Sequence, residues 1–255
     1  MEYKHILVKK DNGLVTITLN RPPLNWLNIA MMEEINQALS GLKDDSGIKL
    51  LMFDASGKAF SVGVEVAEHM NGLAEKMIEV FHGMFRLIDQ VGVPTLAVVH
   101  GSCLGGGCEL AIYCDMVLAL DNAKFGQPEI AVGVYPPIAA LVLPHIIGRK
   151  KAMELVLSGD IIDAKTALEI GLINQVVPVA DKDQAVEKMV NKFLNKSAAI
   201  LKLTKKACLT GILAQSQDNL KTIEDIYLNE VMKTHDALEG LNSFLEKRNP
   251  TWKNC

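Results

Sequence analysis

The sequence predicts a protein of the α/β class with a mostly parallel sheet, followed by a largely helical last third. Short apolar strand patterns alternate with helical patterns up to about residue 150. Beyond that point helical patterns dominate, and one strand-like segment, residues 173–179, interrupts them. The 255 residues are enough for one large domain, or for a core with a smaller terminal region, and they can bury a substantial hydrophobic core.

A hairpin, a helix and a buried strand are expected in the first part of the chain. Asn12-Gly13 is a pair typical of tight hairpin turns, and apolar positions alternate on both sides of it. The proline pair Pro22-Pro23 ends the second strand. The expected elements are strands at residues 6–10 and 15–20, a helix at 30–42 and a strand at 49–53.

A long amphipathic helix is predicted at residues 68–90, where apolar side chains recur every three or four positions. We interpret its methionine and aromatic side chains as packing in the core or in a lid. Strands at residues 95–100 and 116–120 are expected on either side of a glycine run, and a helix is expected to start at Leu110. The later helices are predicted at residues 151–157, 164–170, 181–194, 198–209, 217–234 and 237–247.

Charge and composition argue against several classes of protein. The formal net charge is −4 and the lysines are scattered, whereas a nucleic-acid-binding protein normally carries a basic face. No apolar run approaches membrane-spanning length and the N-terminus is not a signal sequence, so we expect no membrane partner and a cytoplasmic location. The cysteines are too irregular for a disulfide framework or a metal site, so we expect reduced thiols at Cys103, Cys108, Cys114, Cys208 and Cys255.

The most informative stretch is residues 101–110, which contains Gly105-Gly106-Gly107. Consecutive glycines let backbone N–H groups approach a ligand, and N–H groups at a helix N-terminus stabilise negative charge on an oxygen. The pattern indicates an oxyanion hole with the carboxylate of Glu109 beside it. A second carboxylate, Glu129, follows Gln127-Pro128. From chemistry alone, both glutamates are also compatible with surface or ion-paired carboxylates.

Motifs of several other enzyme classes are absent from the sequence. It contains no Gly-x-Gly-x-x-Gly, no Gly-x4-Gly-Lys-[Ser/Thr] and no Gly-x-Ser-x-Gly, so dinucleotide, P-loop and nucleophile-elbow sites lack support. Ser61 and His69 lie close in the sequence, but no partner acid accompanies them, and we expect no catalytic triad.

The motifs resemble those of the enoyl-CoA hydratase (crotonase) superfamily. The central match runs from Gly105 to Ala111, continues at Cys114-Asp115 and ends with residues 125–129. Further segments occur in family order, so the resemblance covers almost the whole chain: Leu19-Asn20-Arg21-Pro22, Lys58 to Gly63, Ala152 to Gly159, Ala167 to Ile173 and Phe244 to Arg248.

This resemblance implies a spiral of strand-strand-helix turns at residues 1–195 and a helical region at 196–255 through which subunits form a trimer or a hexamer. It implies a coenzyme A thioester as substrate, so coenzyme A enters with the substrate and no separate cofactor is expected. The enolate-like oxygen of the thioester is expected to accept hydrogen bonds from the backbone N–H groups of Val64 and Gly106. An alanine is usual where Val64 stands and an aspartate where Glu65 stands, which indicates an altered acyl pocket.

In superfamily members that hydrate a double bond, two glutamates flank the alkene and hold one water, and these match Glu109 and Glu129. Many isomerases and hydrolases of the superfamily lack one of the pair, so the presence of both favours hydration. One carboxylate accepts a proton from water while an acid form delivers a proton to carbon. The substrate is expected to contact Lys58, Val62, Gly63, Gly105, Pro137 and Ile138.

Four segments look like the cyclohexa-1,5-diene-1-carbonyl-CoA hydratases of anaerobic benzoyl-CoA degradation: residues 24–32, 60–70, 134–137 and 235–241, the last of which has milder forms across the superfamily. This resemblance implies a 1,4-addition of water to the ring, giving 6-hydroxycyclohex-1-ene-1-carbonyl-CoA. A ring substrate requires a wide and apolar pocket, which we expect near Val62, Val64, Pro137 and Ile138.

Other interpretations of the sequence stay open. The protein is alternatively a general 2-enoyl-CoA hydratase, an enoyl-CoA isomerase or, in a different class, a non-catalytic acyl-CoA-binding scaffold. We interpret Trp26 as a packing anchor in preference to a substrate contact, and His100 as a partner in a structural hydrogen bond. Lys58, Lys247 and Arg149 are either contacts for the phosphates of coenzyme A or ordinary solvated charges.

Overall fold

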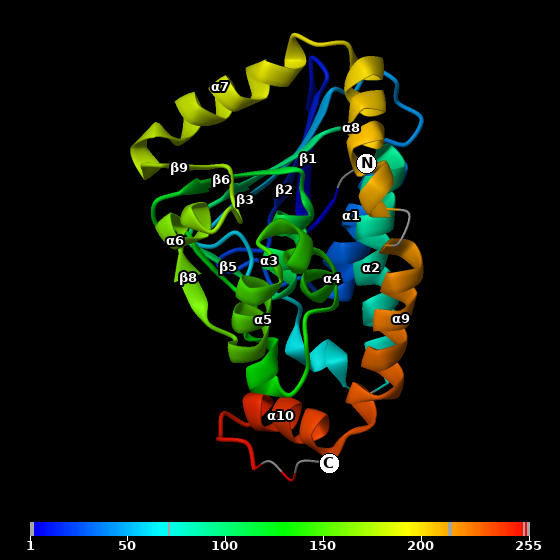
Figure 1. The fold of residues 1–255 in the computed structure, drawn as a ribbon, viewed down its shortest axis with the longest axis vertical. Helices are drawn as coiled ribbons and strands as arrows, with labels where there is room; N and C mark the ends of the chain where they lie inside the picture. The colour runs from blue at the N-terminus through cyan, green and yellow to red at the C-terminus, as the bar shows by residue number, and fades with distance from the viewer. Residues whose placement is uncertain (1–2, 71, 214–215, 252, 254–255) are drawn as a thin grey trace.

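The computed structural model describes residues 3–70, 72–213, 216–251 and 253 (Figure 1). Its main sheet has six strands in the order β1-β2-β3-β4-β6-β9. β1 and β2 form the predicted antiparallel hairpin, and each later neighbour in the sheet pairs in parallel. The bounds of the strands are β1 Ile6–Asp11, β2 Leu14–Leu19, β3 Leu50–Ala55, β4 Thr95–Val99, β6 Met116–Leu120 and β9 Gln175–Val177.

Alternate residues of β3 show why the main sheet is covered on both faces. Leu51 and Phe53 pack in the larger hydrophobic core, together with residues of α1 (Ile29–Ser40), α2 (Ala74–Val91), α3 (Gly106–Tyr113) and α4 (Pro137–Ile146). Leu50 and Met52 point to the opposite face, as the strand period of two requires, and pack in a second core with α7 (Lys182–Leu194). The run of apolar residues in β3 is therefore the pattern of a strand buried on both sides.

A second, three-stranded sheet was not predicted from the sequence. It has the order β5-β7-β8 and consists of β5 Ser102–Leu104, β7 Lys124–Gly126 and β8 Ile161–Asp163. Ser61 extends it by an isolated parallel bridge to Cys103. Each of these strands has three residues, too few for an alternating pattern to be recognised. Along the chain, β4 is followed directly by β5, and β6 directly by β7. Each pass of the chain therefore contributes one strand to the main sheet and one to the second sheet.

Several helices differ from those that the sequence predicts. The helix expected at residues 68–90 is divided into a 3-10 turn, η1 (Val66–His69), and α2, which begins at Ala74. Gly72 between them has a φ of +76°, a left-handed conformation that ends helical geometry. The helix expected from Leu110 begins four residues earlier, within the glycine run, and α4 was not predicted at all.

The last third of the chain is largely helical, as predicted. In Figure 1, α10 lies at the opposite end of the molecule from α7, and α9 runs beside α2. α10 packs closely on the 3-10 turn η2 (Pro128–Val132), because a Cβ atom on Gly240 would lie 2.4 Å from the Val132 carbonyl oxygen. The other elements are α5 Arg149–Ser158, α6 Ala164–Glu169, η3 Val179–Asp181, α8 Ala198–Leu213, α9 Ser216–Asn229, η4 Val231–Lys233 and α10 His235–Leu245. The division of the chain between residues 195 and 196 stays a prediction.

The predicted state of the thiols agrees with the structure for the residues it describes. Cys103, Cys108 and Cys114 are buried and free, and Cys208 is exposed and free. Cys255 lies outside the described residues. Within the described ranges, no group of histidine, cysteine or acidic side chains is arranged to bind a metal ion. No helix there has both the length and the apolar character needed to cross a bilayer.

Lys205 of α8 connects the C-terminal helices to the sheet. Its Nζ lies 2.6 Å from Asp115 Oδ2 and donates to the Val93 carbonyl oxygen at 3.0 Å. The same carboxylate oxygen of Asp115 accepts from the backbone N–H and the hydroxyl of Thr95, at 2.7 and 2.9 Å. The Lys205 side chain is 11% exposed, so the pair is shielded from solvent and is expected to contribute more than a surface ion pair.

We predict that Asp115→Ala lowers the free energy of unfolding by about 3 kcal/mol, because Lys205 and Thr95 both lose their acceptor. Urea denaturation measures this loss. The matched control is Glu169→Ala, which removes a 3.8 Å pair with Lys165 whose two side chains are highly exposed; it should cost less than about 1 kcal/mol. Equal losses of unfolding free energy in the two variants would contradict the stabilising role of the Lys205–Asp115 pair.

Candidate active site

Parallel pairing in the second sheet brings two loops side by side. Ser61 pairs with Cys103, and Cys103 pairs in turn with Phe125. Equivalent positions on neighbouring strands are about 4.8 Å apart, so the residues that follow them are also close together. The third residue after Ser61 is Val64, and the third after Cys103 is Gly106. The register of the sheet therefore places Val64 and Gly106 beside each other.

The backbone N–H groups of Val64 and Gly106 donate to no residue that the structure describes. In the bridge to Leu27, the Gly63 carbonyl oxygen accepts from the Leu27 N–H, and the Glu65 N–H donates to the Leu27 carbonyl oxygen. The Val64 N–H takes no part in this bridge. Gly106 is the first residue of α3 and has no carbonyl one turn earlier in the helix. Two unpaired N–H groups on adjacent strands can bind the same oxygen atom.

Gly105 allows a carboxylate to approach these amides. Its φ is +51°, and a Cβ atom built on it would lie 2.5 Å from Glu129 Oε1. Gly63 plays a similar part on the other strand, because its φ is +105° and an added Cβ would lie 3.3 Å from the Leu104 carbonyl oxygen. Both positions combine a left-handed backbone with a close neighbour, and only glycine meets both conditions without strain.

Glu109 lies in the first turn of α3 and is almost completely buried, with 2% of its surface exposed. Its Oε1 accepts hydrogen bonds from the backbone N–H groups of Ile138 at 2.7 Å and Ala139 at 2.9 Å, in the first turn of α4. Burial raises the pKa of Glu109 to about 7, and the two hydrogen bonds oppose this rise because they stabilise the ionised form.

Glu129 lies in η2, four residues after Phe125. Its Oε2 is shielded from solvent and has no hydrogen-bond partner within the described ranges. Burial raises the pKa of Glu129 well above its ordinary value, and the negative charge of Glu109 raises it further. The contrast with Glu109 is that Glu129 has no amides from α4 to stabilise its ionised form, and its own backbone N–H lowers its pKa by less than burial raises it.

The two carboxyl groups therefore behave as a coupled pair. Removing the proton from both would place two negative charges in one buried site, which is energetically unfavourable. Glu109 is the better place for the single charge because it accepts the hydrogen bonds from α4. Near neutral pH the site thus contains one carboxylate that can accept a proton and one carboxylic acid that can donate one.

The structure brings most of the sequence-predicted site residues together around one pocket of about 290 Å³. Further apolar side chains in its wall come from α2, such as Met77 and Phe81, and from the segment that precedes α4. The predicted residues that line the pocket are Val62, Gly63, Val64, Gly105, Gly106, Glu109, Glu129 and Pro137.

Two predicted substrate contacts do not line this pocket. Ile138 is fully buried, and what it contributes is its backbone N–H, which binds Glu109. The side chain of Ile138 therefore does not line the acyl pocket as predicted. Its backbone N–H instead holds the Glu109 carboxylate. Lys58 is exposed and outside the lining, and so are Arg149 and Lys247. A contact of these three cations with coenzyme A stays a prediction.

The structure assigns clear places to Trp26 and His100. Trp26, which we expected to be a packing anchor, is only partly buried and forms part of the pocket wall. His100 does not line the pocket, and its Nε2 lies 3.2 Å from the Gly57 carbonyl oxygen. The structural hydrogen bond predicted for His100 is thus confirmed, whereas Trp26 lies where it can contact an acyl group.

Sequence reasoning missed several residues of the pocket wall. Tyr227 of α9 and Phe244 of α10 come from the C-terminal helices, and His69 comes from η1. Tyr227 occupies an apolar position of an amphipathic helix, so its spacing indicates burial and not a site. No local pattern in the sequence shows that α9 and α10 return to the glycine run.

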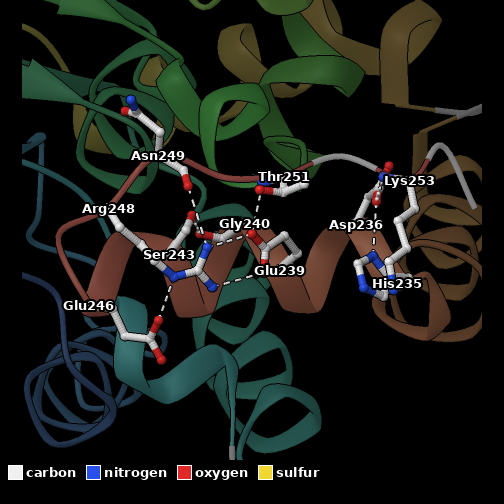
Figure 2. Close-up of polar contacts among 10 residues, drawn as sticks. All are labelled: His235, Asp236, Glu239, Gly240, Ser243, Glu246, Arg248, Asn249, Thr251 and Lys253. Carbon is white, nitrogen blue, oxygen red and sulfur yellow. Dashed lines mark hydrogen bonds and ion pairs between the residues drawn. The ribbon is translucent and has the colours of Figure 1, made fainter.

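The segment after α10 also borders the pocket, and Figure 2 shows how it is held. The two terminal nitrogens of Arg248 lie 2.6 and 2.9 Å from the two carboxylate oxygens of Glu239, and its Nε donates to Glu246. The Thr251 N–H donates to Glu239 as well, at 2.7 Å. Arg248 and Pro250 both line the pocket. These contacts fix the course of the chain at one side of the site.

Comparisons with known proteins agree with this geometry. Residues 9–255 match the family model described as enoyl-CoA hydratase/isomerase. The chain is 36% identical over 250 residues to a cyclohexa-1,5-dienecarbonyl-CoA hydratase of Thauera aromatica, covering 98% of this chain and 96% of that protein. It is 36% identical over 254 residues to a crotonyl-CoA hydratase of Syntrophomonas wolfei, covering 97% of each.

Solved structures show the same fold. An enoyl-CoA hydratase from Mycobacterium avium subsp. paratuberculosis superimposes with a TM-score of 0.89 at 27% sequence identity, over 99% of this chain and all of that one. The two-sheet spiral with a helical C-terminal region is therefore the crotonase fold that the sequence motifs implied. With the family model and these relatives covering nearly its full length, the chain belongs to the enoyl-CoA hydratase/isomerase family.

Proposed function

We propose that this protein is a hydro-lyase that adds water to a conjugated acyl-CoA thioester, with cyclohexa-1,5-diene-1-carbonyl-CoA as its substrate. One observation carries the proposal: a single pocket contains a coupled pair of glutamates and the unpaired N–H groups of Val64 and Gly106. The two N–H groups form an oxyanion hole for the thioester oxygen, and the glutamates move the protons. Coenzyme A enters as part of the substrate, and no further cofactor takes part.

The hydrogen bonds from α4 support an assignment of the two glutamate roles. Glu109 carries the negative charge and acts as the base that takes a proton from water. Glu129 keeps its proton and acts as the acid that delivers it to carbon. Each turnover leaves the proton on Glu109, and exchange between the two groups or with water restores the starting state.

In the proposed reaction, water oxygen forms a bond to the ring carbon β to the thioester carbonyl. The electron pair of that double bond moves toward the carbonyl, and the oxyanion hole stabilises the resulting dienolate. The dienolate then takes the proton of Glu129 at the far end of the second double bond, in a 1,4-addition. The remaining double bond joins the ring carbon that carries the thioester carbonyl to the ring carbon beside the newly protonated one. The product is 6-hydroxycyclohex-1-ene-1-carbonyl-CoA.

The shape of the side chains that line the pocket supports the proposal of a ring substrate. Trp26, Phe81 and Tyr135 present planar side chains to the pocket, and Pro136-Pro137 makes the segment before α4 rigid. Val64 adds bulk beside the glycine run, because its Cγ2 would lie 2.7 Å from a Cβ on Gly106. A relative that is 36% identical is named for the cyclic diene thioester, which supports the same substrate class for this chain.

A second candidate is a general 2-enoyl-CoA hydratase, because the crotonyl-CoA hydratase of Syntrophomonas wolfei is equally identical to this chain. An enoyl-CoA isomerase would use one glutamate, and a non-catalytic acyl-CoA-binding scaffold would need neither. We also propose self-association as a trimer or hexamer. Exposed apolar side chains on α5 and α8, including Leu157, Ile200 and Leu203, support it.

The substrate assignment predicts that kcat/KM for cyclohexa-1,5-diene-1-carbonyl-CoA exceeds that for crotonyl-CoA by at least about tenfold, because the planar wall fits a ring better than a short chain. Chromatography and mass spectrometry of the products measure both reactions. Rapid turnover of crotonyl-CoA with none of the diene would favour the general hydratase. A product that does not gain the mass of water would indicate an isomerase.

The mechanism predicts that Glu109→Gln and Glu129→Gln each lower kcat by about 100- to 10,000-fold, because each removes one proton-transfer group. Stopped assays with the diene thioester measure kcat. Glu154→Gln, on the exposed surface of α5, is the matched control and should retain the parent rate. A Glu129→Gln variant as active as the parent would show that the acid has been assigned to the wrong residue.

The pKa values predict a bell-shaped dependence of kcat/KM on pH. Activity should rise with pH through about 7, as Glu109 loses its proton and becomes the base. It should fall again at higher pH, where Glu129 loses the proton it must donate. Rate measurements across pH test this, and the residual activity of Glu129→Gln should keep the acid limb and lack the alkaline one. An alkaline limb that persists in this variant would contradict the assignment.

A further inference from the structure

Tyr227 is a polar side chain of the pocket for which the mechanism above has no role. It projects from α9, is 1% exposed and lines the same pocket as Glu109 and Glu129. Its ring packs edge-on against that of Tyr135, with 5.4 Å between the ring centroids. This packing fixes the direction of the Tyr227 ring and therefore the place of its hydroxyl.

The hydroxyl of Tyr227 differs from those of Tyr113 and Tyr135. The Tyr135 hydroxyl donates to the Ile223 carbonyl oxygen at 2.6 Å, and the Tyr113 hydroxyl donates to Asp89 at 2.9 Å. None of the hydrogen bonds within the described part of the chain involves the Tyr227 hydroxyl. Buried hydroxyls are normally paired, so one that borders a pocket and has no protein partner indicates a partner in the pocket.

Two other polar side chains of the pocket, Ser243 and Arg248, are already engaged. The Ser243 hydroxyl donates to the Gly240 carbonyl oxygen, and the Arg248 guanidinium is paired with Glu239. Burial, together with the negative charge of the nearby glutamate pair, raises the pKa of Tyr227 far above its ordinary value. Its hydroxyl thus stays protonated and can donate a hydrogen bond throughout the pH range of activity.

We propose that the Tyr227 hydroxyl donates a hydrogen bond to the oxygen that is added to the substrate. This inference rests on the proposed hydratase function. The acyl group itself is a hydrocarbon, and its thioester oxygen is bound by the two amides, so among the atoms of the reactants the added oxygen is the acceptor left for Tyr227. The partner is water before the addition and the new hydroxyl of the product after it.

The hydrogen-bonding capacity of water fits this arrangement. One O–H group donates to Glu109, and one lone pair points to the carbon that is attacked. The second lone pair is free to accept from Tyr227, which fixes the orientation of the water about its O–H bond to Glu109. No covalent bond of Tyr227 changes, and its proton stays on the phenol through the reaction.

Tyr227→Phe removes the hydroxyl and keeps the ring against Tyr135. We expect kcat for the diene thioester to fall by about 10- to 100-fold, the loss of a hydrogen bond to a reacting oxygen, with KM changed by less than about threefold. The matched control is Tyr113→Phe, which removes a buried hydroxyl outside the pocket and should keep the parent kcat. A Tyr227→Phe variant with the parent kcat would overturn the proposal.

A binding measurement separates this role from simple packing. In a Glu129→Gln background, which stops turnover, calorimetry compares 6-hydroxycyclohex-1-ene-1-carbonyl-CoA with cyclohex-1-ene-1-carbonyl-CoA, which lacks the hydroxyl. Adding Tyr227→Phe should weaken binding of the hydroxylated thioester by about tenfold and change that of the other by less than twofold. Equal weakening of both ligands, or of neither, would refute the contact.

Failure of this inference can be told from failure of the proposed function. If the parent hydrates a thioester and Tyr227→Phe matches it, the function stands and the role of Tyr227 is wrong. If the parent hydrates crotonyl-CoA and not the diene, the same comparison is made with 3-hydroxybutyryl-CoA and butyryl-CoA. A parent that hydrates neither refutes both.

Discussion

The parallel pairing of Ser61 with Cys103, and of Cys103 with Phe125, is the constraint on which the site depends. Three segments far apart in the sequence leave this short sheet at one edge, and the register decides which of their residues meet. A slip of one residue would reverse the direction of every side chain and amide on the shifted strand. It would separate the Val64 and Gly106 amides. The main sheet, with its long parallel strands, is what holds the short strands in this register.

The second requirement is that the two buried glutamates, Glu109 and Glu129, differ in their electrostatic surroundings. Burial alone raises the pKa of both glutamates and would leave them alike. The first turn of α4 makes them different, since the amides of Ile138 and Ala139 bind Glu109 and leave Glu129 without such support. The position of the N-terminus of α4 therefore determines which of the two glutamates holds the shared proton. Without it, the two carboxyls would exchange acid and base roles freely.

Much of this was predictable from local sequence, and the remainder depends on contacts between distant segments. Residues 116–120 form the strand that their apolar run predicts, and the glycine run with its two glutamates indicated the chemistry before any fold was known. The second sheet has strands of three residues, which pair across the chain and leave no local pattern. α4 follows two prolines that indicate a turn, and Tyr227 follows the spacing of a core residue. In both cases the functional role comes from packing that periodicity does not encode.

The position of α4 links substrate choice to reaction rate. Pro137 at its start lines the acyl pocket, while the next two residues donate to Glu109. A substitution that reshapes this end of α4 for another acyl group would also move the amides, and with them the charge on Glu109. α10 is less constrained, because Phe244 reaches the pocket by its side chain alone. Adaptation to a new acyl group is therefore easier through α10 than through α4, because a change at Phe244 leaves the amides that bind Glu109 in place.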